Sequence, residues 1–323
     1  VMLNYDEFKE LVIEKLKDYF PEPYRDYEMA VHPVFRTNEV KDGITLRRPG
    51  QTISPTIYIQ DMYQAYRSGN DLNDVLKHTA DFYVEKSKQM DVNMDFLNKL
   101  PSDQIYMSLI NTAENQELLK SCPHRQFQDL SVVYRVFIGQ NETGIMSARI
   151  DEGLAEKYKV TEPELYELAY KNTEKLFPSV VRPLNDMLRE IMESQDVPDE
   201  IIDSTLEDNL LYIVTNNKQI SGASAILYEE NLHNLAELYG GDLYVIPSSV
   251  HEMLVLPADS DMLPDEIANI VQEVNQMAVQ PEERLSNQVY RYDSRERKMS
   301  IVSHSPEQLH DQKKEQPVKG RTR

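Results

Sequence analysis

Two short polar segments hold the side chains of this 323-residue chain whose types and spacing could do chemistry. Each segment follows a proline, contains a histidine and flanks an expected strand, and ligand sites commonly form at strand ends. The candidate catalytic residues are His124, Arg125, Asp129, Ser249, His251 and Glu252. If the two segments meet in the fold, these side chains could line one pocket and serve a hydrolase-like or nucleotide-acting enzyme.

Neither segment completes a known catalytic motif. His251-Glu252 begins the HExxH pattern of zinc peptidases, but the position of the second histidine is Val255. We also expect this segment to be a strand, in which neighbouring side chains point to opposite faces and cannot converge on one metal. No GxSxG elbow surrounds Ser249, and turn serines ordinarily satisfy backbone groups. The simpler interpretation is therefore two separate turn and capping networks.

Cofactor and metal chemistry find little support in the sequence. Cys122 is the only cysteine, and Pro123 separates it from His124, so we expect a buried structural thiol. Cys122, His124 and His251 offer three metal ligands without a recognised spacing. The chain has only 10 glycines and no GxxxxGK[ST], GxGxxG or CxxC motif. The sequence thus predicts no cofactor and no metal.

Helical and alternating apolar patterns occur throughout the chain. We expect helices over 4–20, 54–67, 71–83, 113–121, 162–176, 182–193, 231–239 and 264–277. We expect strands over 27–35, 43–47, 105–110, 130–138, 144–150, 210–215, 223–228, 243–246, 250–256, 289–292 and 299–302. This mixture predicts an α+β fold, with mixed or antiparallel sheets and packed helices in two lobes. The smaller, helix-rich lobe would span 1–95, the larger one 96–305, and 306–323 would be a disordered polar tail.

The charge distribution restricts the partners. The net charge of −21 repels nucleic acids and anionic lipids, whereas 291–323 carries nine Lys or Arg and five Asp or Glu. We therefore expect nucleic acid to bind, if at all, through the basic tail. No apolar run approaches the length of a membrane span, and no secretory leader or disulfide pair is visible, which favours a cytoplasmic location.

Six stretches carry a resemblance to a known family. They are SPTIYIQDMYQAYRSG (54–69), CPHRQFQDLSVVYRVF (122–137), LYELAYKNTEKLFP (165–178), LYIVTNNKQISGASAILY (211–228), YVIPSSVHEMLVLP (244–257) and VNQMAVQPEERLSNQVYRYD (274–293). Over about residues 4–302 the chain resembles family 5688 of the domains of unknown function. The resemblance implies a cytoplasmic bacterial protein linked to mobile elements, and it assigns no catalytic residue.

Three functional hypotheses remain open. The leading one is a non-enzymatic interaction or accessory module with a protein partner, because no catalytic constellation is complete and the chain is strongly acidic. The alternative is the hydrolase-like or nucleotide-acting enzyme described above. The third is a nucleic-acid binder that acts through the basic tail.

Overall fold

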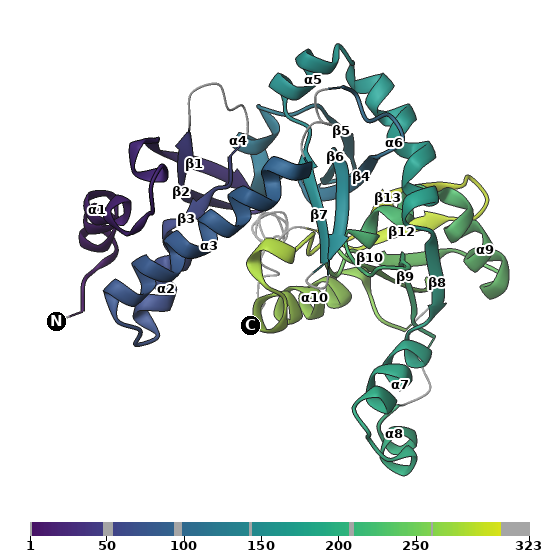
Figure 1. Ribbon diagram of the computed structural model, residues 1–323. Coiled ribbons are helices and arrows are strands. Elements are labelled where there is room, and N and C mark those ends of the chain that lie inside the picture. The colour runs from purple at the N-terminus through teal and green to yellow at the C-terminus, as the bar shows by residue number, and fades with distance from the viewer. Residues whose placement is uncertain are drawn as a thin grey trace, which may run out of the picture. The chain divides into compact units, whose positions relative to one another are not determined.

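The computed structural model describes residues 2–47, 54–93, 99–141, 144–206, 210–259 and 261–304. The chain divides into two compact units, Val1–Pro101 and Ser102–Arg323, called here the N-terminal and C-terminal units. The described residues form helices and three antiparallel sheets joined by turns and loops, which confirms the predicted α+β class (Figure 1). The predicted disordered tail, 306–323, lies outside the described residues.

The N-terminal unit combines a three-stranded sheet with helices. Its elements are α1 (Tyr5–Lys15), β1 (Glu28–Arg36), β2 (Glu39–Arg47), β3 (Ile57–Tyr58), α2 (Ile59–Arg67) and α3 (Leu72–Asn93). A capping box opens α1, since Asn4 and Glu7 each accept a hydrogen bond from the other's backbone N–H at 3.0 Å. The sheet order is β1-β2-β3.

A tyrosine of α3 bonds to the sheet of this unit. Tyr83 is buried, and its hydroxyl donates to the carbonyl of Leu46 at 2.9 Å and accepts from the Leu46 N–H at 3.1 Å. Its ring packs edge-on against Phe20. One side chain thus satisfies both backbone polar groups of a β2 residue inside the core.

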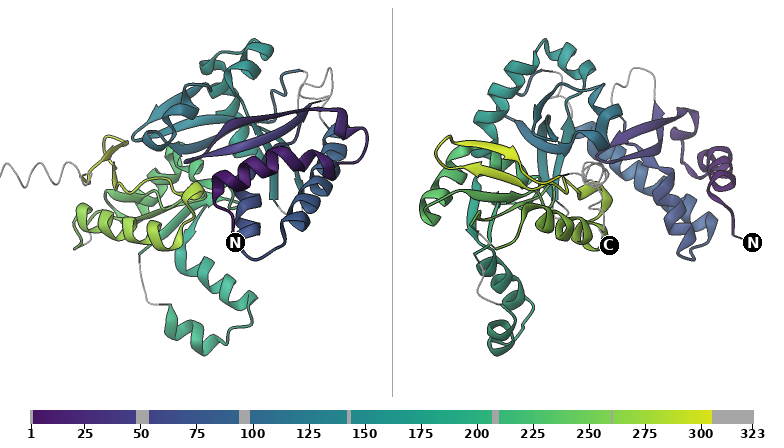
Figure 2. Two further views of the ribbon diagram at one scale, coloured as in Figure 1. Left: turned by 90° about the vertical axis from the view of Figure 1, so that its left-hand side faces the viewer. Right: turned by 180° about the vertical axis from the view of Figure 1, so that it is seen from behind.

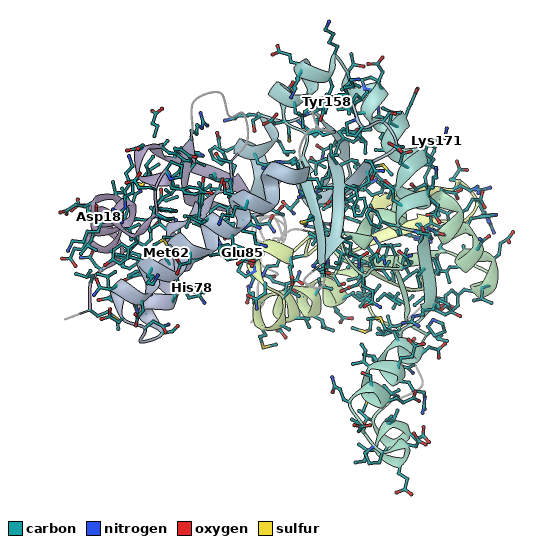
Figure 3. The ribbon with its side chains drawn as sticks, in the orientation of Figure 1. Asp18, Met62, His78, Glu85, Tyr158 and Lys171 are labelled. Atoms are coloured by element: carbon teal, nitrogen blue, oxygen red, sulfur yellow. The ribbon has the colours of Figure 1, made fainter. Side chains whose placement is uncertain are left out.

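The C-terminal unit begins with a four-stranded sheet and the helices that follow it. These elements are β4 (Ile105–Asn111), α4 (Gln116–Leu119), β5 (His124–Phe127), β6 (Leu130–Asn141), β7 (Gly144–Arg149), α5 (Glu152–Tyr158) and α6 (Glu162–Leu176). Strand β6 is central, and β4, β5 and β7 all pair with it. Helix α6 is anchored to β4 by Thr173, whose hydroxyl accepts from the Met107 N–H at 2.9 Å. Lys171 lies on the outer side of α6 (Figure 3).

A six-stranded antiparallel sheet forms the rest of this unit. Its elements are β8 (Ser179–Pro183), α7 (Leu184–Ser194), α8 (Asp199–Thr205), β9 (Tyr212–Asn216), α9 (Glu229–Tyr239), β10 (Leu243–Ile246), β11 (Met253–Pro257), α10 (Pro264–Ala278), β12 (Tyr290–Asp293) and β13 (Lys298–Ile301). The strand order is β13-β12-β10-β11-β9-β8. Helix α10 packs on one face of it through Ile267 and Val271. Helices α7 and α8 extend away from it (Figure 2).

Several sequence-based assignments were wrong, including the helix start expected at 54, since Ile57–Tyr58 is strand β3 and α2 begins at Ile59. The segment expected as a strand at 223–228 is a 3-10 helix, Gly222–Leu227. It packs so closely on β9 that a Cβ at Gly222 would lie 2.3 Å from Thr215 Oγ1, which accounts for the glycine. Strand β11 begins at Met253, so His251 lies in the preceding loop rather than on a strand face. Finally, α3 continues to Asn93, beyond the expected helix end at 83.

None of the described helices combines the length and the apolar character that crossing a bilayer requires.

Replacing Tyr83 by Phe should lower the stability of the N-terminal unit. The change leaves both backbone groups of Leu46 without their hydroxyl partner in the core, which costs about 1–3 kcal/mol. Tyr19→Phe is the matched control, because the Tyr19 hydroxyl bonds to Asn73 at an exposed site. Denaturant unfolding of the two variants measures the difference, and equal stabilities would contradict the role given to Tyr83.

Candidate functional site

His124 and Arg125 lie on β5, where Arg125 is already engaged. Its guanidinium donates to both carboxylate oxygens of Glu162 at 3.1 Å and lies 3.7 Å from the centre of the Tyr166 ring. The Tyr134 hydroxyl donates to the same carboxylate. Burial, together with this carboxylate, raises the pKa of Tyr134, so the phenol stays protonated. Arg125 therefore joins β5 to the start of α6.

His124 is exposed and borders a shallow hollow. Its Nδ1 lies 3.0 Å from the Cys122 carbonyl. The hollow, with a volume of about 500 Å³, is lined by residues of the β5 and α5–α6 regions that include His124, Cys122 and Glu162. Burial raises the pKa of the Cys122 thiol to about 11, so the thiolate that a nucleophile requires is disfavoured.

Asp129 bonds to Ser286 and to Tyr290 of the six-stranded sheet, and not to His124 or Arg125. Its carboxylate accepts from the Ser286 hydroxyl at 2.5 Å and from the Tyr290 hydroxyl. Tyr290 is fully buried, and burial with the Asp129 charge raises its pKa. This carboxylate is thus a link between the turn after β5 and strand β12.

The second segment forms a loop network in front of β11. The Ser249 hydroxyl donates to Glu252 Oε1 at 3.0 Å and accepts from the His251 N–H at 3.1 Å. His251 Nδ1 accepts from the Ser221 N–H at 3.2 Å, which places the ring proton on Nε2, 3.3 Å from Glu283 Oε1. The imidazole therefore bonds to Ser221 and Glu283, and Ser249 to Glu252.

The two segments have separate partners. Side chains of the first segment contact Cys122, Glu162, Tyr166, Ser286 and Tyr290. Those of the second segment contact Ser221 and Glu283. Across the ranges that the structure covers, no hydrogen bond or ion pair joins one set to the other, and no group of three or more His, Cys, Asp or Glu could hold a metal. An enzyme built on these six residues stays a prediction.

A different feature of the C-terminal unit offers a binding surface. A groove of about 530 Å³ runs between α10 and the face of the six-stranded sheet. Its lining is almost entirely apolar and comes from β10, β11, α10 and the segment before β9. The apolar lining residues are Leu210, Leu211, Ile246, Leu254, Leu256, Pro257, Met262, Ile267, Ile270, Val271 and Val274. Of residues 247–252, which include the candidates Ser249, His251 and Glu252, only Ser248 lines this groove.

The sequence of β11 explains why the groove exists. The strand reads MLVLP, and Met253 and Val255 are fully buried on one face of the sheet. Leu254 and Leu256 alternate with them and point to the α10 face, where they are half-buried. A strand that is apolar on both faces needs cover on both. Helix α10 supplies only part of that cover.

The apolar face of helix α10 is only partly buried. Ile267 and Val271 pack on the sheet, whereas Ile270 is 49% and Val274 45% exposed beside the groove. Leu210, on the opposite wall, is 63% exposed. Contiguous exposed apolar surface of this kind marks interaction sites on folded proteins.

The segment that forms the α10 side of the groove is acidic. The segment 257–283 carries seven carboxylates and no Lys or Arg. Asp259 lines the groove, and Glu273 is exposed on α10. An apolar floor with an acidic surround fits an apolar ligand that carries positive charge.

Sequence reasoning found α10 but missed the groove. Ile267, Ile270, Val271 and Val274 follow the i, i+3, i+4, i+7 spacing of one helix face, which predicts a buried stripe and does not show that part of it stays exposed. The N-terminal unit holds a larger groove, of about 810 Å³, between α2 and α3, lined among others by Met62 and His78 (Figure 3). Its lining mixes Arg36, Asp61 and Asp74, so neither charge nor apolarity defines a ligand there.

Comparison with known proteins identifies the family of this chain but no activity. The model of a family of unknown function, DUF5688, matches residues 5–294, and the chain belongs to this family. No curated protein and no solved structure matches the chain.

Replacing Asp129 by Asn should destabilise the C-terminal unit. The amide turns one acceptor oxygen into a donor facing the Ser286 and Tyr290 hydroxyls, which costs about 1–3 kcal/mol. The matched control is Asp186→Asn at an exposed position of α7. Denaturant unfolding separates the two variants, and an Asp129→Asn protein as stable as the control would refute the structural role of this carboxylate.

Proposed function

We propose that this family member is a non-enzymatic interaction module, and that the groove beside α10 docks a basic amphipathic helix of a partner protein. The observation that carries the proposal is the exposed apolar lining of the groove, in which Ile270, Val274 and Leu210 remain accessible. A helix laid in an apolar groove is a recurring mode of protein recognition, with anchors at i, i+3, i+4 and i+7.

The charge of the groove's surroundings supports the choice of partner. Seven carboxylates with no compensating cation in 257–283 disfavour an acidic helix and favour one with Lys or Arg beside its apolar face. The same charge disfavours a second copy of this groove, because two acidic surrounds would meet. The chain's own basic tail is a competing occupant, although 306–323 offers few apolar side chains.

The proposal also covers the location and the cellular context of the protein. We place the protein in the cytoplasm, which is consistent with a single cysteine, Cys122, that is buried and unpaired. The link to bacterial mobile elements rests on the family resemblance alone. The enzyme hypothesis remains the alternative, and its residues are those of the two polar segments.

Ile270→Glu should weaken binding of a synthetic helix with a leucine face and a lysine face. Each mutation of a central apolar contact is expected to reduce affinity by about tenfold or more. The substitution also adds a negative charge, so purely electrostatic binding would become stronger. Leu238→Glu is the matched control, because Leu238 is 65% exposed on α9, which lies apart from α10 (Figures 1 and 2).

Fluorescence anisotropy of the labelled helix measures both variants. Equal affinities for the Ile270→Glu and Leu238→Glu proteins would exclude the groove as the docking site. A peptide of residues 306–323 that displaces the labelled helix at comparable concentration would identify the tail as the occupant and contradict an external partner.

Reversing charge at the groove should weaken binding of the same helix and reduce the salt dependence of its affinity. Asp259→Lys and Glu273→Lys together remove two attractive carboxylates and add two repulsive cations, which reduces long-range attraction most at low ionic strength. The control is the single variant Glu14→Lys on α1, and its change in salt dependence is compared with half of the change in the double variant. Anisotropy titrations at low and high salt give the slopes, and an unchanged slope in the double variant would rule out a role for these carboxylates.

A further inference from the structure

Helices α7 and α8 form an arm, defined here as residues 184–206, at the edge of the six-stranded sheet. The edge strand β8 leads directly into α7 at Leu184. In all three views the two helices extend away from the strands of the unit (Figures 1 and 2). The apolar side chains of such an arm have little of the unit's own core to pack against.

The arm nevertheless carries a regular apolar stripe. Its α7 members follow the i, i+3, i+4, i+7, i+8 spacing of one helix face and are Leu184, Met187, Leu188, Ile191 and Met192. Helix α7 is described over its whole length and has no buried residue, and Ile191 is 41% exposed. From α8, Ile202 is buried but Ile201 is 52% exposed. The stripe is therefore only partly covered by α8.

The charge of the arm resembles that of the groove's surroundings. Residues 184–206 carry seven carboxylates and one arginine, a net charge of −6. Two of the seven form ion pairs, Glu190 with Arg182 and Asp203 with Arg189. Nucleic acid, an anionic membrane or another copy of the arm would be repelled, whereas a basic amphipathic helix would be attracted.

The arm and the groove share a border. The Leu184 N–H, at the first residue of the stripe, donates to the Leu211 carbonyl at 2.9 Å. Leu211 and Leu210 both line the groove. The first residue of the arm is therefore hydrogen-bonded to a residue of the groove's lining.

We propose that the arm is a second docking face, which binds a further basic amphipathic helix of the same partner that occupies the groove. This inference rests on the proposed function and specifies the partner as a chain with two such helical segments. The groove is a concave apolar site, so a single helix fills it first. The arm adds affinity only when a second helix is tethered to the first.

The test compares the single leucine–lysine helix with two copies joined by a flexible Gly/Ser linker. Because the second contact becomes intramolecular, the tandem should bind the wild-type protein at least about tenfold more tightly than the single helix. Ile191→Glu should remove most of this gain while leaving the affinity for the single helix unchanged. Ile191→Gln, which adds no charge, should have the same effect, and circular dichroism checks that both variants keep their helices.

Each outcome has a distinct meaning. If the tandem binds no more tightly than the single helix, or if both Ile191 variants keep the gain in affinity, the arm is not a docking face. Either result leaves the proposal for the groove intact. A single helix that fails to bind the wild-type protein would overturn the proposed function together with this inference. Leu238→Glu should retain the full tandem gain.

Discussion

The structure depends on one constraint in strand β11, which is apolar on both of its faces. Met253 and Val255 close the core on one side, and Leu254 and Leu256 need cover on the other. Helix α10 provides that cover through Ile267 and Val271 and leaves the rest of the face accessible. Since buried apolar surface stabilises by about 25 cal/mol per Å², a partner that completes the cover gains free energy that the isolated chain does not.

Under the proposed function, the charge near the groove selects the partner. The carboxylates around α10 and along the arm have the same sign, and both regions contain almost no compensating cation. In contrast, the polar side chains near His124 and His251 mostly bond to each other and to the backbone. Arg125 is occupied by Glu162, Asp129 by Tyr290, and Ser249 by Glu252. A ligand there would have to replace existing hydrogen bonds, whereas the groove requires no such exchange.

Much of the fold could be predicted from the sequence, because local signals specify it. The capping box at Asn4 and the proline-initiated helix at Pro264 begin where expected, and β6 and the last hairpin are clear in their β-branched and aromatic residues. The 3-10 helix at Gly222–Leu227 was missed because it is set by close packing on Thr215, a long-range contact. The groove was missed because the side that α10 leaves open depends on which strands it crosses, which periodicity does not encode.

Methyl NMR of the isoleucine-, leucine- and valine-labelled protein, titrated with the leucine–lysine helix, tests the central claim most directly. The account predicts that the largest shifts fall on the methyl groups of Leu254, Leu256, Ile270 and Val274, which line the groove. Shifts concentrated on other methyl groups, with these four unchanged at saturation, would contradict it.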